Sequence, residues 1–260
     1  MVLRRRRQIA LDNLALAYPA LPLRARARLA RHASQHFGMT LMELARVLTH
    51  PLDETLGRIR LDGAEHLTAA MRTHGRALVL TAHLGNWELL AAAHRLTRFP
   101  LSIVVRPLDA PWLDAVADRL RRSTGVELID KRGALRPVLD ALRRGRMIGI
   151  LMDQNAARAE GAFVDFFGRP ASTSRSIAVL ALRTRTPVVP IFARRDPDGC
   201  HTVLIQPALP LPETNGSDAA IVELTARCTA VIERAIREVP EQWLWSHDRW
   251  RTRPPGEARV

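Results

Sequence analysis

Short apolar runs alternate with longer amphipathic stretches over most of the chain, from about residue 76 onward. Apolar runs of about five residues between helical stretches of about ten to twelve are typical of strands that are buried on both faces and joined by crossover helices. On this pattern the expected strands are residues 77–81, 101–105, 126–129, 147–152 and 188–192. The expected helices are residues 87–96, 111–123, 134–143 and 173–183. The sequence therefore predicts an α/β fold with a mixed, mostly parallel central sheet flanked by helices.

The two ends of the chain complete this prediction. Residues 203–206 form one more expected strand, antiparallel because only the short turn Asp196–Gly199 precedes it. Residues 218–239 have the spacing of a closing helix, and the first fifty residues show helical periodicity. No repeat or flexible linker separates these parts. We therefore expect a single domain over residues 1–260, with the helical N-terminal segment 1–50 packing on the α/β core.

The charge of the chain narrows the choice of partners. Lys+Arg number 39 against 26 Asp+Glu, which gives a net charge of +13. Such a surface favours polyanionic partners: nucleic acid, anionic lipid or an acidic carrier protein. Lys131 is the only lysine, so the positive charge is almost entirely arginine, which suits bidentate contacts to phosphate and carboxylate. A G+C-rich genome would produce the same arginine bias, so the bias alone does not identify a partner.

Cysteine content and apolar run length exclude other classes. Cys200 and Cys228 are the only cysteines, and their spacing fits neither a disulfide framework nor a metal site, so we expect no metal and a reducing compartment. No apolar run approaches the ~18 to 20 residues of a spanning helix, and the arginine-rich start lacks the apolar region of a signal peptide. The chain as written is expected to lie on a membrane without crossing it.

A histidine and a glutamate follow directly on the first strand, in Thr81-Ala-His-Leu-Gly-Asn-Trp-Glu88. This context puts His83 on the loop at the strand's carboxyl end, where open α/β sheets bind ligands, and lets Asn86 cap the next helix. Glu88 then lies in the first helical turn, from where its carboxylate can reach the imidazole. A carboxylate on one ring nitrogen fixes the tautomer, so the other nitrogen can take a proton from a hydroxyl. By spacing and location alone, a purely structural pair is an equal interpretation.

The segment from His83 to Glu88 resembles the catalytic His-x4-Asp/Glu motif of the lipid A biosynthesis lauroyl/myristoyl acyltransferase family. Further blocks match that family in order and cover nearly the whole chain: Arg4 to Pro19, Leu151 to Gln154 with Gly161 to Pro170, Pro187 to Pro190, and Pro240 to Trp250 with Arg253 to Gly256. The resemblance implies transfer of a fatty acyl chain from an acyl carrier protein thioester to a hydroxyl of a phosphorylated glycolipid, a lipid A precursor. It makes His83 the general base and Glu88 its orienting partner. No cofactor is expected, because the thioester is already activated.

Other polar residues are candidates for substrate binding. Asp153 and Gln154 end another expected strand and should share the cleft with His83, although a turn cap is an equal interpretation of Asp153. Asn86 is a further candidate for substrate binding. Three arginines could clamp an acceptor phosphate, or could simply be solvated: Arg106, Arg119 and Arg122.

Two aromatic groups admit more than one interpretation. Phe167, with its neighbouring phenylalanines, could line an acyl groove or belong to the core. Trp243, Trp245 and Trp250, interleaved with arginines, suit a membrane interface or stacking on bases. We favour a third interpretation, in which the indoles dock on the core.

Family members usually carry an apolar helical anchor ahead of the arginine-rich segment with which this chain begins. We therefore expect the cytoplasmic face of the bacterial inner membrane as its location, either through an anchor missing from this chain or peripherally through Arg4 to Arg7 and an apolar face that includes Leu11 and Leu14.

Three alternatives stay open at this point. A phosphatidylinositol mannoside acyltransferase using acyl-CoA belongs to the same superfamily, and another hydroxylated lipid could be the acceptor. A non-catalytic module that binds nucleic acid or membrane would fit the charge, but no nucleic-acid-binding motif is present in the sequence, so no nucleic acid is expected as a partner.

Overall fold

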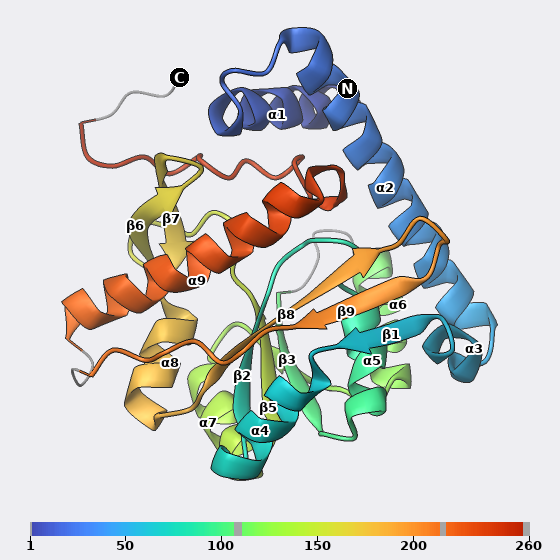
Figure 1. The fold of residues 1–260 in the computed structure, drawn as a ribbon, viewed down its shortest axis with the longest axis vertical. Helices are drawn as coiled ribbons and strands as arrows, with labels where there is room; N and C mark the ends of the chain where they lie inside the picture. Colours follow the sequence, from blue (N-terminus) through green and yellow to red (C-terminus); the bar gives the residue numbers. More distant parts are fainter. Residues whose placement is uncertain (1, 107–110, 214–216, 257–260) are drawn as a thin grey trace.

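A computed structural model describes residues 2–106, 111–213 and 217–256 of the chain. A central sheet of seven strands, in the order β1-β9-β8-β2-β5-β3-β4, lies between two layers of helices (Figure 1). Its strands are β1 (Ile59–Asp62), β2 (Ala77–Thr81), β3 (Leu101–Val105), β4 (Glu127–Asp130), β5 (Met147–Leu151), β8 (Val188–Arg195) and β9 (His201–Ile205). The helices are α1 (Val2–Ala17), α2 (Leu23–Thr49), α3 (Leu52–Leu56), α4 (Ala64–His74), α5 (Leu89–Thr97), α6 (Pro111–Ser123), α7 (Leu135–Arg143), α8 (Ser176–Thr184), α9 (Asp218–Glu238) and the 3-10 turn η1 (Pro240–Gln242).

The sheet is mostly parallel, which confirms the predicted fold class. Strands β8, β2, β5, β3 and β4 run parallel, whereas β9 pairs antiparallel with β8, and β1 follows β9. The short turn before β9 reverses the chain as the sequence predicted. β2 and β5 are immediate neighbours, with Thr81 opposite Leu151. The loops that follow these two strands therefore leave the sheet side by side.

The continuous apolar character of the strands follows from burial on both faces. In β5, Ile148 and Ile150 point into the core formed with α7, α8 and α9, while Met147 points to the opposite face, toward α4 and α5. The same alternation in β2 places Leu78 and Leu80 on one face and Ala77 and Val79 on the other. Each strand thus needs apolar residues at nearly every position.

Several segments differ from the predicted pattern. β1, α3 and α4 were not predicted, and the helix expected from residue 173 begins only at Ser176. The residues before it form the hairpin β6 (Gly161–Phe166) and β7 (Arg169–Ser174), joined by Phe167 and Gly168 in left-handed conformation at φ 57° and 74°. Polar β7 has no apolar alternation, so only its pairing with β6 makes it a strand.

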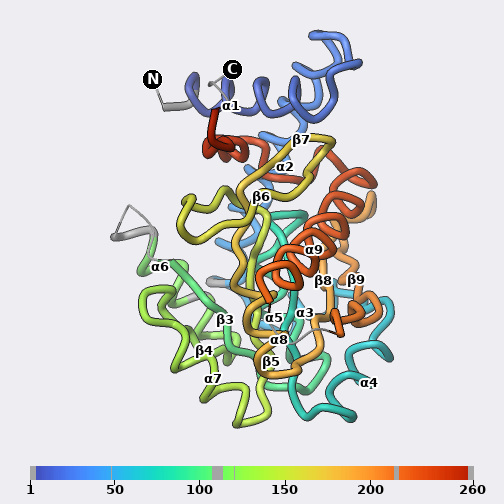
Figure 2. Tube along the Cα trace, turned by 90° about the vertical axis from the view of Figure 1, so that its left-hand side faces the viewer, coloured from blue at the N-terminus to red at the C-terminus, as the bar shows by residue number. Residues whose placement is uncertain are grey.

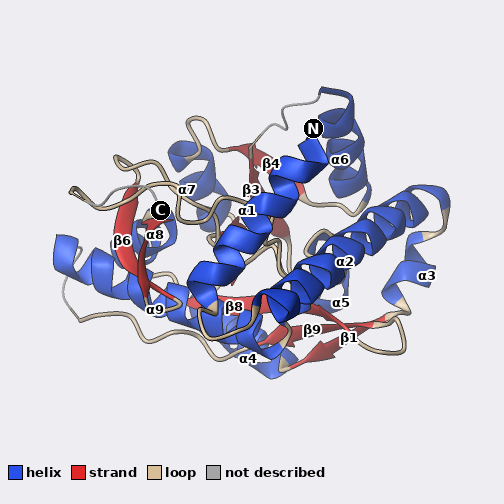
Figure 3. Cartoon of the chain, turned by 90° about the horizontal axis from the view of Figure 1, so that it is seen from above, coloured by secondary structure: helices blue, strands red, loops and turns tan. Residues whose placement is uncertain are grey.

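The N-terminal helices pack on the C-terminal segment rather than standing apart. Leu14 is fully buried, and the Asn13 amide donates to the carbonyl oxygens of Trp245 and His247, at 2.7 and 2.6 Å. Figure 2 shows α1 beside the red C-terminal segment, and Figure 3 shows α2 beside α6. Leu14 therefore belongs to the core, which corrects its expected place on a membrane-facing surface. None of the described helices is both long and apolar enough to cross a membrane.

The C-terminal tryptophans are core residues. Their indoles are almost fully buried, with exposed fractions of 2% for Trp243, 1% for Trp245 and 2% for Trp250. The rings of Trp243 and Trp245 pack edge to face. Buried aromatic side chains of this size dominate core energetics. The structure thus confirms that the indoles dock on the core and do not form an interfacial belt.

Candidate active site

The histidine of the first motif meets an aspartate from the neighbouring strand. His83 lies two residues beyond the end of β2, and Asp153 lies two residues beyond the end of β5. Because Thr81 and Leu151 are register partners, these two residues leave the sheet at the same edge. The Nδ1 atom of His83 lies 2.9 Å from Oδ1 of Asp153, and the main-chain N–H of His83 donates to Oδ2 at 3.0 Å.

The Asp153 carboxylate is buried and fully engaged. Its side chain is 2% exposed, and the indole N–H of Trp243 donates to Oδ2 at 2.8 Å. Burial raises the pKa of Asp153, but the His83 charge and the hydrogen bonds from His83 and Trp243 outweigh burial and lower the pKa to about 2. Asp153 is therefore an anion that holds the His83 ring in one orientation.

The second ring nitrogen of His83 points to a polar neighbour at the surface. Nε2 lies 3.2 Å from the amide nitrogen of Gln154, and the His83 side chain is 19% exposed. An amide nitrogen only donates, so Nε2 is the acceptor and the ring proton sits on Nδ1, against Asp153. In this tautomer the basic lone pair of the ring is on Nε2, where it accepts the Gln154 N–H, and it can act as a general base when a hydroxyl takes the place of that amide.

The loop that carries His83 is clamped on two sides. Gly85 has φ of 61°, and a Cβ there would lie 2.0 Å from the carbonyl oxygen of Ala193 in β8. From the other side, Gly85 N–H donates to the carbonyl oxygen of Gln242 at 3.0 Å, and Leu244 N–H donates to the carbonyl oxygen of His83 at 3.1 Å. Glycine is needed here because of both the left-handed backbone and the close contact.

Glu88 does not orient His83 in this structure. Its carboxylate forms a two-point ion pair with Arg121 of α6, at 2.7 and 3.0 Å, with both side chains 12% exposed. The motif suggested that Glu88 pairs with His83. In the structure Asp153 pairs with His83 instead, and Glu88 pairs with Arg121. The reason is that Glu88 lies at the N-terminal end of α5, where its carboxylate meets Arg121 of α6 and forms no capping hydrogen bond, while strand pairing brings Asp153 to the ring.

The three arginines named from the sequence lie at the surface. Arg106 and Arg119 are exposed, Arg106 with a partner of its own, and Arg122 is 64% exposed beside Asp118 at 4.0 Å. The arginine that reaches the site is Arg121. Arg121 shares a half-buried face of α6 with Asp114 and Ala117, and because this mixed set of side chains is not an apolar stripe, the sequence did not mark Arg121.

Asn86 serves as an anchor of the loop and not as a helix cap. It is fully buried, and its amide nitrogen donates to Glu43 of α2 at 2.7 Å. Glu43 also accepts from both terminal nitrogens of Arg195 and lies 3.1 Å from Nε2 of His201. The role of Glu43 was not predicted, because the sequence around a glutamate in an amphipathic helix does not indicate that its carboxylate has a buried partner.

Comparison with known proteins gives the family of the chain. A model of the bacterial lipid A biosynthesis acyltransferase family matches residues 1–252 of the chain. The chain belongs to this family. The Escherichia coli (strain K12) lipid A biosynthesis palmitoleoyltransferase is 26% identical over 260 residues, covering 99% of this chain and 83% of that protein. The lauroyltransferase of the same organism is 28% identical over 257 residues, covering 98% and 82%. The phosphatidylinositol mannoside acyltransferase of Mycobacterium tuberculosis is 27% identical over 209 residues, covering 79% and 62%.

These relatives are acyltransferases, and the resemblance recognised in the motifs is confirmed. This lipid A acyltransferase family member keeps the ordered motif blocks, and the structure explains two of them. The block at residues 151–154 supplies Asp153 and Gln154 to His83. The C-terminal block supplies Trp243 to Asp153, and the His247 ring accepts the N–H of Asn155 at 3.1 Å.

Phe167 lies in this family member's core, behind the site. It is 5% exposed and packs against Tyr18, Trp245 and Phe166, with the Arg237 guanidinium 4.4 Å from its ring centre. Its ring thus supports the aromatic cluster that holds Trp243. A role in binding substrate stays a prediction.

Proposed function

We propose that this protein transfers a fatty acyl chain from an acyl carrier protein thioester to a hydroxyl of a lipid A precursor, a late acylation of lipid A biosynthesis. The observation that carries the proposal is the pair His83–Asp153, which leaves Nε2 as a hydrogen-bond acceptor at the exposed side of the ring. Family membership supports the acyl transfer, and the pair supplies a group able to perform it.

The proposed reaction needs no acyl-enzyme. His83 Nε2 takes the proton of the acceptor hydroxyl as its oxygen attacks the thioester carbonyl, and the C–O bond forms. The tetrahedral intermediate then expels the thiolate, which receives the proton from the imidazolium. Asp153 stabilises the imidazolium between these steps, since it is an anion 2.9 Å from Nδ1.

Charge supports an acidic donor and a phosphorylated acceptor. The net charge of +13 and the exposed guanidinium groups of Arg4 to Arg7 favour docking of an acidic carrier protein. Arg106, Arg119 and Arg122 stay proposed contacts for acceptor phosphate.

A lipid acceptor also requires access to a membrane surface, and we place the protein on the cytoplasmic face of the inner membrane. Helix α2 exposes apolar side chains next to the site: Met39 at 46%, Leu41 at 45% and Met42 at 73%. Phe37 of the same helix stacks on Trp87, which contacts the His83 ring edge-on. An apolar surface this close to His83 suits an acceptor that stays in its bilayer. Loss of sedimentation with anionic vesicles in Met42→Glu would test this placement.

The deciding experiment measures thiol release from lauroyl-acyl carrier protein with a phosphorylated, acylated glucosamine disaccharide as acceptor. His83→Ala and Asp153→Asn are each expected to lower kcat by roughly a hundredfold or more, because the first removes the general base and the second removes the anion that orients the His83 ring and stabilises its imidazolium. Matched controls are His66→Ala, a surface histidine, and Asp130→Asn, an aspartate at another strand end that contacts no histidine in the described structure.

Full activity of Asp153→Asn would contradict its orienting role. Thiol release by the wild type that does not depend on the disaccharide would contradict its assignment as the acyl acceptor. Turnover with acyl-CoA and a mannosylated lipid, and none with the disaccharide, would assign the chain the activity named for its mycobacterial relative.

A further inference from the structure

The proposed reaction creates a negative charge that neither His83 nor Asp153 can neutralise. As the acceptor hydroxyl attacks, the carbonyl oxygen of the thioester becomes an anion in the tetrahedral intermediate. Hydrogen-bond donors placed at such an oxygen are usually the largest single contribution to catalysis of acyl transfer. His83 receives the proton of the hydroxyl, and Asp153 is itself an anion. The donor must therefore be another group at the same edge of the sheet.

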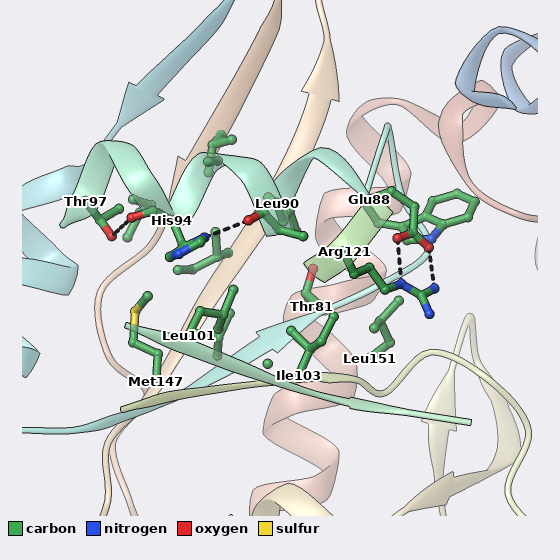
Figure 4. A pocket seen from close by; sticks show the side chains of 18 of the residues that line it. Thr81, Glu88, Leu90, His94, Thr97, Leu101, Ile103, Arg121, Met147 and Leu151 are labelled. Carbon is green, nitrogen blue, oxygen red and sulfur yellow. Dashed lines mark hydrogen bonds and ion pairs between the residues drawn. The ribbon is translucent and has the colours of Figure 1, made fainter. Parts of the chain in front are cut away.

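Two arginines near the site are engaged elsewhere. Arg121 and Glu88 line one end of the pocket in Figure 4, where the guanidinium is turned toward the carboxylate. The Nε and one terminal nitrogen of Arg121 donate to Glu88 at 3.0 and 2.7 Å, and the other terminal nitrogen lies 3.8 Å from Asp118. Arg249 is fully buried, so it does not meet a substrate at the surface of the site. Neither arginine is placed to donate to the oxyanion.

Gln154 places a donor at the atom where the proton is transferred. Its amide nitrogen lies 3.2 Å from Nε2 of His83. Because Asp153 holds the ring proton on Nδ1, Nε2 carries the lone pair and faces the amide nitrogen, not the amide oxygen. An N–H of Gln154 therefore points to the place that the reacting hydroxyl will occupy.

The main chain on both sides of Gln154 is held in place. Asp153, before it, is buried and fully hydrogen-bonded. After it, the main-chain N–H of Asn155 donates to Nε2 of His247 at 3.1 Å, and the Asn155 side chain exchanges two hydrogen bonds with Thr252, at 3.0 and 2.9 Å. Burial lowers the pKa of His247 to about 4, so its ring is neutral at pH 7 and Nε2 can accept. The amide of Gln154 is thus carried on a fixed segment, as a preorganised donor requires.

The attack on the thioester brings the new charge within reach of this amide. The acceptor hydroxyl displaces the amide from Nε2 and donates its hydrogen bond to His83. As the C–O bond forms, the π electrons of the carbonyl move to its oxygen, and the hydroxyl proton passes to Nε2. Because both oxygens are bonded to one carbon, an amide that has left Nε2 can reach the oxyanion at about 3 Å. When the carbonyl forms again, the thiolate leaves and takes the proton from His83.

We propose that Gln154 is the oxyanion donor of this enzyme: its amide N–H binds the carbonyl oxygen of the thioester as that oxygen becomes negative. The inference rests on the proposed acyl transfer and adds a catalytic residue to it. Hydrogen bonds to an ionised acceptor are roughly twice as strong as those between neutral groups. The amide therefore stabilises the intermediate more than the bound thioester, and this difference lowers the barrier.

Substitution of Gln154 tests the role of the amide. Gln154→Met removes the donor and keeps the length of the side chain, so kcat should fall by roughly 100- to 1,000-fold while KM changes by no more than about twofold. Gln154→Asn keeps an amide on a shorter side chain and should retain more activity than Gln154→Met. The matched control is Gln8→Met, a surface glutamine of α1 whose amide donates to Asp12 at 2.8 Å, which should keep the wild-type kcat. An unchanged or higher kcat in Gln154→Met would overturn the inference, because a side chain that only blocks Nε2 gives that result.

Replacement of the carbonyl oxygen by sulfur tests the oxyanion directly. In a dithioester donor, C=S replaces C=O, so the negative charge forms on sulfur, a weaker hydrogen-bond acceptor. The ratio of thioester to dithioester kcat should be about tenfold or more larger in the wild type than in Gln154→Met, which has no donor to lose. Both substrates are measured on one enzyme sample, so an incompletely folded fraction does not change the ratio. Equal ratios in the two enzymes would contradict an oxyanion contact of Gln154.

Hydrolysis of the thioester by water separates this inference from the proposed function. Acyl transfer to the disaccharide with a kcat that Gln154→Met leaves unchanged overturns the inference alone. Hydrolysis that Gln154→Met slows, without any transfer to the disaccharide, overturns the acceptor and upholds Gln154 as the donor. Absence of both transfer and hydrolysis in the wild type overturns both.

Discussion

The two carboxylates near the loop that carries His83 have different partners. Asp153 lies against the His83 ring, whereas Glu88 lies against the Arg121 guanidinium, 2.7 Å away and equally buried. Breaking a buried ion pair of this kind is costly, because removing one partner leaves the other charge buried without compensation.

At the residue scale, we predict that Glu88→Ala and Arg121→Ala each lower the free energy of unfolding by about 2 to 4 kcal/mol. The double variant Glu88→Gln/Arg121→Met should recover much of that loss, since it removes both charges together. Urea unfolding of the three variants measures this coupling. If Glu88 acted on His83 instead, the double variant would be no more stable than Glu88→Ala.

At the element scale, one glutamate connects the long helix α2 to the loop that carries His83 and Asn86. Glu43 accepts from Asn86 of the loop and from Arg195 of β8. Burial raises the pKa of Glu43, but hydrogen bonds from His201, Arg195 and Asn86 outweigh it and lower the pKa to about 2. α2 is thus fastened to the site by a charge cluster and not by apolar packing alone.

We predict that Glu43→Gln lowers the free energy of unfolding by about 2 to 4 kcal/mol, because Arg195 loses its buried counter-charge. It should also lower kcat more than it raises KM, since Asn86 loses the carboxylate that holds the loop. Glu54→Gln is the control: its ion pair with Arg46 is about half exposed, so the change should stay within ~0.5 kcal/mol. Equal effects of the two substitutions would contradict a special role for Glu43.

At the scale of the whole molecule, the buried His36 and the half-buried His247 should make stability depend on pH. Burial lowers the pKa of both His36 and His247 to about 4, from an ordinary value of 6.5. Between these values the unfolded chain binds more protons than the folded one. The stabilising contribution is therefore complete above about pH 6.5 and is lost as pH falls toward 4.

We predict that the free energy of unfolding is lower at about pH 5 than at pH 7 by roughly 1 to 3 kcal/mol. His36→Gln and His247→Gln should each flatten this dependence, while His66→Gln, a surface histidine, should not. Chemical denaturation across the pH range measures it. Below pH 4 a second loss is expected from Asp153 and Glu43, whose folded pKa values of about 2 lie below their ordinary ones. A flat profile from pH 7 to 5 would contradict the burial of the two rings.

The sequence by itself determined the features that depend on neighbours along the chain. Apolar runs of strand length established the α/β class, because a strand buried on both faces needs apolar residues throughout. The same runs placed His83 and Asp153 at strand ends, and the ordered motif blocks identified the family.

Only the tertiary structure decided which of these groups meet. β2 and β5 are adjacent in the sheet but are separated in the chain by two other strands, so no local pattern reveals that Asp153 and not Glu88 reaches His83. The position of α6 likewise brings Arg121, and not its exposed neighbours, to Glu88. Side-chain partners across strands and helices are set by strand order and packing, and these are properties of the folded chain.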